Sequence, residues 1–284
     1  IRDRVYAAIK GNAASARLIE NGNGIADFKV ATPFPIPQSA LEVLWNHLVR
    51  YRGDSVKRYY AQAVPHASGD YFMTQIEDLF LFNQDAGDYA KDNGNVLFYF
   101  RQSVLAPARL AGTELLVHET VNQVKEPRLA WLYAAGQRRV RRTPNVAYDS
   151  PGTASEGMRT TDNFDMFSGA PDKYDWQLVG KQELYVPYNS YRFAAKTNKY
   201  SDIVRPGHVN PDLLRYELHR VWHVRATLKA GQRHQYKQRD MYFDEDSYQI
   251  LVVDHYDNRD NLWRLGESYT INLYDQPLVW TKGD

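Results

Sequence analysis

The sequence predicts a mainly β protein of the α+β class, in which a large, curved antiparallel sheet forms a half-barrel. The first observation is residues 214–228, where apolar and polar side chains alternate with the period of two that is typical of a half-buried strand. At about 3.3 Å per residue this stretch would be about 50 Å long. A small flat sheet cannot hold such a strand, so we expect a large and curved one.

The second observation is that the following residues repeat this pattern. Residues 233–243, 248–256 and 262–273 are predicted strands joined by short polar turns. Such connections imply antiparallel neighbours, because parallel strands need crossovers of about a dozen residues. One face of this meander is apolar, and another part of the chain must cover it.

The third observation is a predicted helix at residues 38–50. Leu41, Leu44, Trp45 and Leu48 recur at helical spacing and form one apolar stripe. We expect this helix to cover the concave face of the sheet. It either closes the core or acts as a lid over a cavity, and the sequence leaves both alternatives open.

The rest of the chain is assigned to the same domain, residues 1–284, because no linker or change in composition divides it. Residues 1–37 form an N-terminal arm with a short helix at residues 2–10, and the sheet extends over residues 55–273. Residues 143–175 form a long loop with little periodicity. The remaining predicted strands are residues 55–63, 71–82, 95–104, 113–122, 128–133 and 138–142.

Composition excludes several classes of function. The chain has 35 basic and 34 acidic residues, a net charge of +1, so no global field attracts nucleic acid. It has no cysteine, which removes disulfides, thiolate nucleophiles and cysteine zinc sites. No apolar run reaches the ~18 residues of a transmembrane helix.

No catalytic signature is present, and we expect neither an enzyme nor a cofactor. His219 and His223 share one face of a predicted strand, but they lie about 13 Å apart, too far to hold one metal ion. Carboxylates such as Asp162 and Asp165 leave saccharide binding or hydrolysis as an alternative. Aspartates in loops are also common for backbone reasons.

Two groups of side chains are candidate binding residues. Four arginines lie close together in a predicted strand and suit an anionic partner or headgroup, although a solvated surface is the plain alternative: Arg138, Arg139, Arg141 and Arg142. The second group is expected to line an apolar cavity formed by sheet, helix and loop. Its members are Leu44, Trp45, Leu48, Phe164, Met166, Phe167, Leu218, Trp222 and Val224.

Several motifs resemble an uncharacterised family of Gram-negative secreted proteins, a domain of unknown function that is related to the outer-membrane lipoprotein-sorting carriers and receptors. The similarity extends from about residue 16 to about residue 275. The motifs are WLY at 131–133, QRRVRR at 137–142, DNFDMF at 162–167, YDW at 174–176, LVGK at 178–181 and NPDLLRYELHRVW at 210–222.

The resemblance implies a half-barrel with helices over an apolar cavity, and a periplasmic location with possible outer-membrane association. It also implies partnership with a resistance-nodulation-division exporter or an outer-membrane partner, and a chain truncated at both ends. It supplies no catalytic residues. We therefore expect a periplasmic carrier or adaptor for a lipid or other hydrophobic ligand. The alternative besides a saccharide-binding protein is a non-catalytic interaction protein that docks an exporter.

Overall fold

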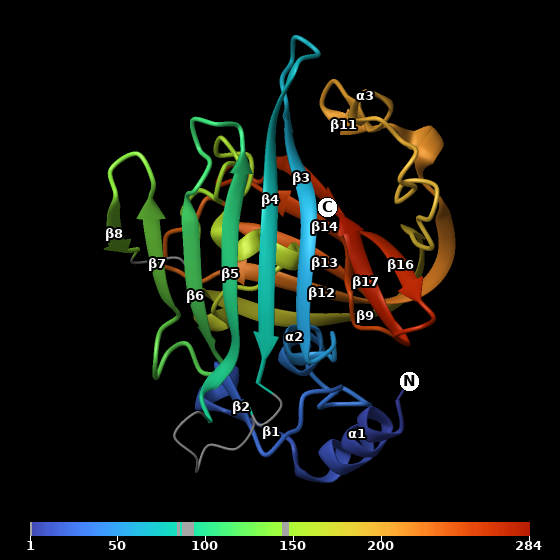
Figure 1. Cartoon of the computed structure of the whole chain (residues 1–284). Coiled ribbons are helices and arrows are strands. Elements are labelled where there is room, and N and C mark those ends of the chain that lie inside the picture. Colours follow the sequence, from blue (N-terminus) through green and yellow to red (C-terminus); the bar gives the residue numbers. More distant parts are fainter. Residues whose placement is uncertain (1, 84–85, 87–93, 144–147) are drawn as a thin grey trace.

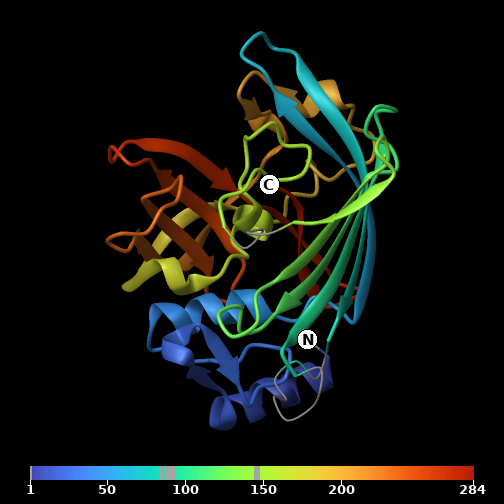
Figure 2. The same cartoon turned by 90° about the vertical axis from the view of Figure 1, so that its left-hand side faces the viewer.

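The computed structural model describes residues 2–83, 86, 94–143 and 148–284. Strands make up 45% and helices 16%, and the antiparallel sheets do not close on themselves, so the mainly β prediction is confirmed. Two large sheets face each other: one has six strands and the other five (Figures 1 and 2).

The six-stranded sheet follows the order of the sequence, β3-β4-β5-β6-β7-β8. It is a meander because each strand pairs antiparallel with the next, as Phe80 of β4 does with Phe100 of β5. All of its strands were predicted within a few residues. They are β3 (Ser55–Pro65), β4 (Tyr71–Phe82), β5 (Val96–Ala106), β6 (Glu114–Thr120), β7 (Leu129–Ala134) and β8 (Arg139–Arg142).

The five-stranded sheet has the order β15-β14-β13-β12-β9. The predicted antiparallel meander after residue 214 is confirmed, and Trp222 of β12 pairs with Phe243 of β13. The strand β9 was not predicted; it extends the sheet beyond β12. The strands are β9 (Tyr174–Pro187), β12 (Tyr216–Leu228), β13 (Gln238–Asp244), β14 (Ile250–Tyr256) and β15 (Leu262–Glu267).

Two details of the predicted sheet are wrong. The expected single strand at 262–273 breaks at Ser268, whose backbone N–H bonds to the carbonyl of Leu251. The chain then leaves the sheet as β16 (Tyr269–Leu273) and pairs with β17 (Leu278–Gly283). Trp280 of β17 lies 6.0 Å from the Arg58 guanidinium of β3, so this hairpin approaches the six-stranded sheet. The second difference is that the sheet predicted over residues 55–273 is divided into two separate sheets.

Helix α2 (Ala40–Val49) confirms the helix predicted at 38–50. Ser39 accepts a hydrogen bond from the Glu42 N–H and caps its first turn. Helix α1 (Asp3–Ser15) is longer than predicted. The other short elements are β1 (Arg17–Ile19), η1 (Glu20–Gly22), β2 (Gly24–Ala26), η2 (Thr161–Met166), η3 (Pro171–Lys173), α3 (Tyr200–Ile203), β10 (Val204–Arg205), β11 (His208–Val209) and η4 (Pro211–Leu213).

The long loop predicted at 143–175 enters the space between the two sheets, where it is drawn in yellow-green in Figure 2. Residues 144–147 of this prediction lie outside the described residues. Its last residues belong to η3 and β9 rather than to a loop. Across the described residues, no helix is both long and apolar enough to cross a membrane.

Candidate functional site

Helix α2 packs against both sheets. Val43 and Leu44 belong to the core of the five-stranded sheet. Trp45 and Val49 belong to the core of the six-stranded sheet. The apolar surface of this helix is therefore wider than one stripe, and the helix lies at one end of the space between the sheets (Figure 1).

The six-stranded sheet presents a wall of aromatic rings toward this space. Phe80 and Phe82 come from β4, and Phe98 and Phe100 come from β5; all four are buried. Their alternate spacing places them on one face of the sheet. The centroids of Phe80 and Phe100 are 4.7 Å apart, and those of Phe82 and Phe98 are 5.8 Å apart.

Residues 160–168, here called the central segment, fill the space in front of this wall. The Phe164 ring lies 5.6 Å from Phe100 and 6.1 Å from Phe80. Met166 and Phe167 point into the core of the opposite sheet. One irregular segment therefore contacts both sheets, and it does so with side chains three residues or fewer apart.

The central segment is held on one side by Asp165. Its Oδ2 atom accepts hydrogen bonds from Arg50 at 2.6 Å and from Arg52 at 2.7 Å. Burial raises the pKa of the Asp165 carboxyl, but the two guanidinium groups outweigh it and hold this pKa well below its usual range. Asp165 and Met166 have φ values of 52° and 71°, so the segment is held in a conformation that such residues rarely adopt.

His47 of α2 also holds the central segment. Its Nε2 lies 3.1 and 3.2 Å from the carbonyls of Asp165 and Phe167. Its Nδ1 lies 3.1 Å from both the Tyr248 carbonyl and Arg50 Nη1. Burial lowers the pKa of His47 to about 3, so the ring is neutral at pH 7.

On the other side, Asp162 holds the segment to the five-stranded sheet. Its Oδ2 accepts from Arg239 of β13 at 2.7 Å and lies 3.0 Å from His234 Nε2. Arg239 is completely buried, and the rings of Phe167, Tyr174 and Tyr236 lie 5.0–5.2 Å from its guanidinium carbon. Two aspartates three residues apart therefore link the segment to the five-stranded sheet and to the end of α2.

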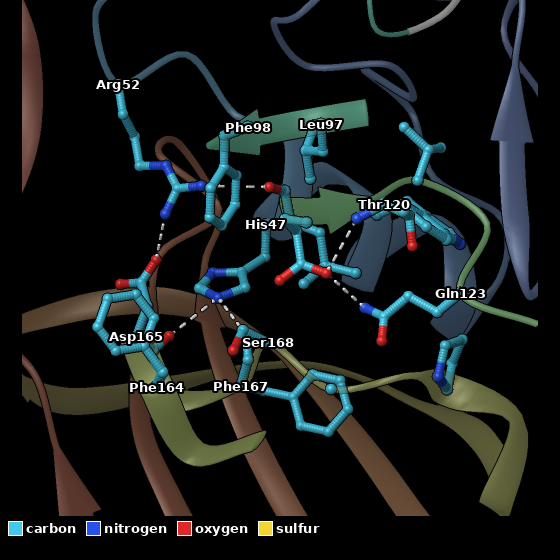
Figure 3. A pocket seen from close by; sticks show the side chains of 16 residues that line it. His47, Arg52, Leu97, Phe98, Thr120, Gln123, Phe164, Asp165, Phe167 and Ser168 are labelled. Carbon is cyan, nitrogen blue, oxygen red and sulfur yellow. Dashed lines mark hydrogen bonds and ion pairs between the residues drawn. The ribbon is translucent and has the colours of Figure 1, made fainter. Parts of the chain in front are cut away.

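A small cavity remains between α2, β5, β6 and the central segment (Figure 3). Its volume is about 20 Å³, which is room for roughly one water molecule. Its lining combines aromatic rings with charged groups: Trp45, His47, Leu48, Arg52, Leu97, Phe98, Glu119, Thr120, Val121, Gln123, Phe164, Asp165, Phe167, Ser168, Gly169 and Pro171. Within the part of the chain that the structure describes, Arg52 Nε and Gln123 Oε1 lack hydrogen-bond partners.

The cavity residues expected from the sequence are divided between three environments. Trp45, Leu48, Phe164 and Phe167 line the cavity. Leu44, Met166 and Val224 are packed in the core of the five-stranded sheet, with Trp222 partly buried against it. Leu218 is 54% exposed and lies outside the cavity. Trp222 and Val224 therefore pack in or against the core of the five-stranded sheet and do not line this cavity.

The four arginines lie at the edge of the six-stranded sheet. Arg139, Arg141 and Arg142 are in β8, and Arg138 is in the turn before it, with a φ of 51°. All four side chains are exposed, and so is Val140 between them. They form a basic edge that is separate from the cavity.

The charged residues of the cavity were not predicted. Arg50 is the last residue of the helix predicted at 38–50 and Arg52 lies two residues beyond it, but they meet Asp165 only across more than one hundred residues of sequence. Glu119 and Arg128 form a buried ion pair at 2.6 Å on the far side of the cavity. The available signal was the position of Arg50 and Arg52 just past α2. Basic side chains there can donate to the last carbonyls of a helix, as these two do toward His47 and Leu48.

No group of three or more histidine, aspartate or glutamate side chains that could hold a metal ion occurs in the described ranges. His219 instead contacts Asp244 at 2.9 Å, and His223 contacts Asp240 at 2.8 Å. Both imidazoles therefore have carboxylate partners in the sheet.

Two facing, unclosed antiparallel sheets with a helix and an irregular segment between them define the class of lipoprotein-sorting-like folds. The crystal structure of a putative outer membrane lipoprotein-sorting protein domain from Vibrio parahaemolyticus has this fold, with a TM-score of 0.55 and 14% identity over 85% of this chain and 82% of that one. The chain belongs to the family described as Protein of unknown function (DUF1329), whose model matches residues 1–284.

Two further proteins are similar to this chain. An uncharacterized protein of Pseudomonas aeruginosa is 58% identical over 277 residues, which is 97% of this chain and 61% of that protein. The chain thus spans less than two thirds of this relative. A DUF1329 family protein from Desulfovibrio piger has a crystal structure with a TM-score of 0.49 and 16% identity, over 75% of this chain and 70% of that one.

Proposed function

We propose that this protein is a carrier or adaptor that binds a lipid or another hydrophobic ligand between its two sheets. One observation carries the proposal: the aromatic wall of the six-stranded sheet is covered by the irregular central segment, which ion pairs hold in place. Phe164 itself is only partly buried against this wall. A ligand would therefore occupy the wall by displacing Phe164.

Displacement is required by size. A cavity of about 20 Å³ is far below the roughly 300–1,000 Å³ of a ligand pocket. Burial of apolar ligand surface at roughly 25 cal/mol per Å² would offset the loss of the Phe164 contacts. No covalent chemistry is needed for such retention, in keeping with the expectation of a non-enzymatic protein.

The cellular setting is part of the same proposal. The fold is shared with the domain from Vibrio parahaemolyticus that is described as a putative outer membrane lipoprotein-sorting protein domain. We propose a periplasmic location and a role in the transport of lipids or hydrophobic molecules in the envelope. An exporter of the resistance-nodulation-division type stays a predicted partner.

The first experiment is native mass spectrometry of the protein purified from its own source, followed by organic extraction and lipid analysis. We expect a stoichiometric additional mass that extracts as lipid. The protein stripped of lipid should then take up a fluorescent fatty acid. A clean mass of the bare chain together with no uptake would contradict the carrier proposal.

A second candidate function is a non-catalytic interaction protein, in which the chain itself fills the space between the two sheets. The small volume of the cavity favours it, because the central segment already fills the space. The two candidates differ in one result: the interaction protein retains and takes up no hydrophobic probe, even at concentrations where the carrier is saturated.

A further inference from the structure

Two arginines at the border of the cavity share one carboxylate. Arg50 and Arg52 donate to the same oxygen atom, Oδ2 of Asp165, at 2.6 and 2.7 Å. Arg50 also donates to the Gln249 side-chain carbonyl at 2.5 Å, so an uncharged group completes its partners. Two guanidinium groups therefore share a single carboxylate.

The neighbouring charges are already matched. Arg128 pairs with Glu119 at 2.6 Å, and Arg58 pairs with Asp78 at 2.7 Å. His47 is neutral at pH 7 because burial lowers its pKa to about 3. Each of these two pairs balances its own charge, which leaves Arg50 and Arg52 with the single carboxylate of Asp165.

Of these two arginines, Arg52 is the one that lines the cavity. Its side chain is 11% exposed, and Nε has no hydrogen-bond partner among the described residues. Burial, and then the repulsion of Arg50, lower the pKa of Arg52 to about 10. Nη1 donates to Asp165 and Nη2 lies 3.5 Å from the Leu48 carbonyl, so Nε is the N–H that remains for an anion. A buried N–H without a partner is costly, and an anionic acceptor would remove that cost.

The surroundings of Arg52 indicate what kind of anion fits. Its guanidinium carbon lies 5.0 Å from the centroid of Phe82 and 5.7 Å from that of Phe98. An anionic group at Nε would therefore lie at the border of the aromatic wall. Its remaining, apolar part could continue along the rings that Phe164 covers.

We infer that the ligand is an amphiphile with an anionic headgroup, a carboxylate or a phosphate, and that Arg52 binds this headgroup in the cavity. The inference rests on the proposed carrier function and names the class of its ligand. Arg52 contacts the ligand directly, whereas Asp165 and Arg50 position Arg52.

The test compares charged and neutral forms of one probe on the unmodified protein. We expect cis-parinaric acid to bind about tenfold more tightly than its methyl ester, since charge-assisted hydrogen bonds are among the strongest available. The ester is the more apolar molecule, so apolar binding alone would give the opposite order. Dodecyl phosphate and dodecanol, as competitors of the ester, extend the comparison and show whether carboxylate or phosphate is preferred.

A pair of variants assigns the effect to Arg52. Arg52→Gln should weaken binding of the acid about tenfold and leave binding of the ester unchanged. Arg101→Gln removes one positive charge from an exposed position in β5, on the outer face of the six-stranded sheet. We expect it to change the affinity for neither the acid nor the ester. Should Arg52→Gln fail to fold, Arg52→Lys keeps the charge, and the comparison of acid and ester on the unmodified protein still decides.

Each outcome has a definite meaning. Tighter binding of acid or phosphate, lost in Arg52→Gln, supports the inference. Equal binding of acid and ester overturns the headgroup site and leaves the carrier function standing. Binding of neither probe overturns both.

Discussion

Arg239 is a fully buried cation whose charge is compensated by the carboxylate of Asp162. Asp162 Oδ2 lies 2.7 Å from Arg239 Nη2, and three aromatic rings surround the guanidinium group. The free energy of this arrangement lies less in the ion pair itself than in the cost of leaving either partner alone. The pair therefore also fixes the position of the central segment.

Asp162→Asn should lower the free energy of unfolding by about 3–5 kcal/mol, because it leaves the Arg239 charge buried and uncompensated. Urea denaturation measures the loss. Asp260→Asn is the control: Asp260 is 70% exposed and pairs with Lys237 at the surface, so we expect a loss below about 1 kcal/mol. Equal losses in the two variants would show that Arg239 finds another partner.

Two buried histidines predict how stability depends on pH. Burial lowers the pKa of both His47 and His255 to about 3, whereas an unfolded histidine titrates near 6.5. Between these values the unfolded chain binds protons that the folded chain does not. The free energy of unfolding should therefore fall as the pH falls from about 6.5 to 4.5, with a slope that approaches about 1.4 kcal/mol per pH unit for each histidine.

Urea denaturation at pH 7.0, 6.0, 5.0 and 4.5 measures this slope. His255→Gln should reduce it by about half, and substitution of the exposed His66 by Gln should leave it unchanged. A slope that is identical in His255→Gln and the unmodified protein would contradict the assignment. Carboxylates also titrate at pH 5.0 and 4.5, and burial raises the pKa of Asp78 and Glu119, so the difference between variant and unmodified protein is the quantity compared.

Phe164→Ala tests whether the aromatic wall can be uncovered. The variant removes the ring that lies 5.6 Å from Phe100, so it should cost about 3–5 kcal/mol of stability and bind a hydrophobic probe several-fold more tightly. Fluorescence titration measures the binding. Phe193→Ala removes a ring that packs on Tyr269 instead, and we expect unchanged affinity. Unchanged affinity in Phe164→Ala as well would mean that the probe binds elsewhere.

Among the secondary-structure elements, those with a clear period were predictable. The apolar residues of helix α2 and strand β12 recur at about 3.6 and 2 residues, and these periods predicted both elements. Strand β9 alternates between exposed and partly buried side chains over much of its length, and Tyr174, Trp176 and Leu178 pack in one core. It was missed because its first residues were assigned to the loop at 143–175. The break at Ser268 depends on a backbone bond to Leu251, which no local pattern indicates.

The candidate site was predictable only where it is apolar. Trp45 and Phe164 were expected in a cavity because their types and spacing suit one. Arg52 and Asp165 were not paired in advance, because their contact is made by the path of the central segment between the sheets. A charge has no periodicity, and its partner is identified only once the fold is known.

The basic edge of β8 predicts binding to an anionic membrane surface. Substitution of Arg138, Arg139, Arg141 and Arg142 by Gln should weaken binding to vesicles that contain phosphatidylglycerol by tenfold or more, since each arginine near such a surface contributes about 1 kcal/mol. Vesicle sedimentation at low salt measures it. The matched control replaces four exposed, ion-paired arginines: Arg4, Arg17, Arg215 and Arg220. Equal weakening by both sets would reduce the effect to net charge.

At the scale of the whole molecule, α2 and the central segment connect the two sheets. The core of each sheet contains side chains from both connectors. The single domain expected from the sequence stays a prediction, and these shared contacts are its physical basis. Neither sheet can lose its cover without exposing the core of the other.

We therefore expect both sheets to unfold in one transition. Labelling with 5-fluorotryptophan reports on Trp131 in the six-stranded sheet, Trp222 in the five-stranded sheet and Trp45 in α2. The fluorine resonances of all three should disappear at the same urea concentration. Separate midpoints for Trp131 and Trp222 would instead divide the molecule into two domains.

The basic edge also affects how copies of this molecule meet one another. In the described chain β8 pairs with β7 alone, so its other side offers free backbone groups to which a strand from a second copy could add. Two such edges would bring together four arginines from each copy, and their mutual repulsion opposes the pairing. The arginines thereby discourage edge-to-edge aggregation at the place where the six-stranded sheet ends.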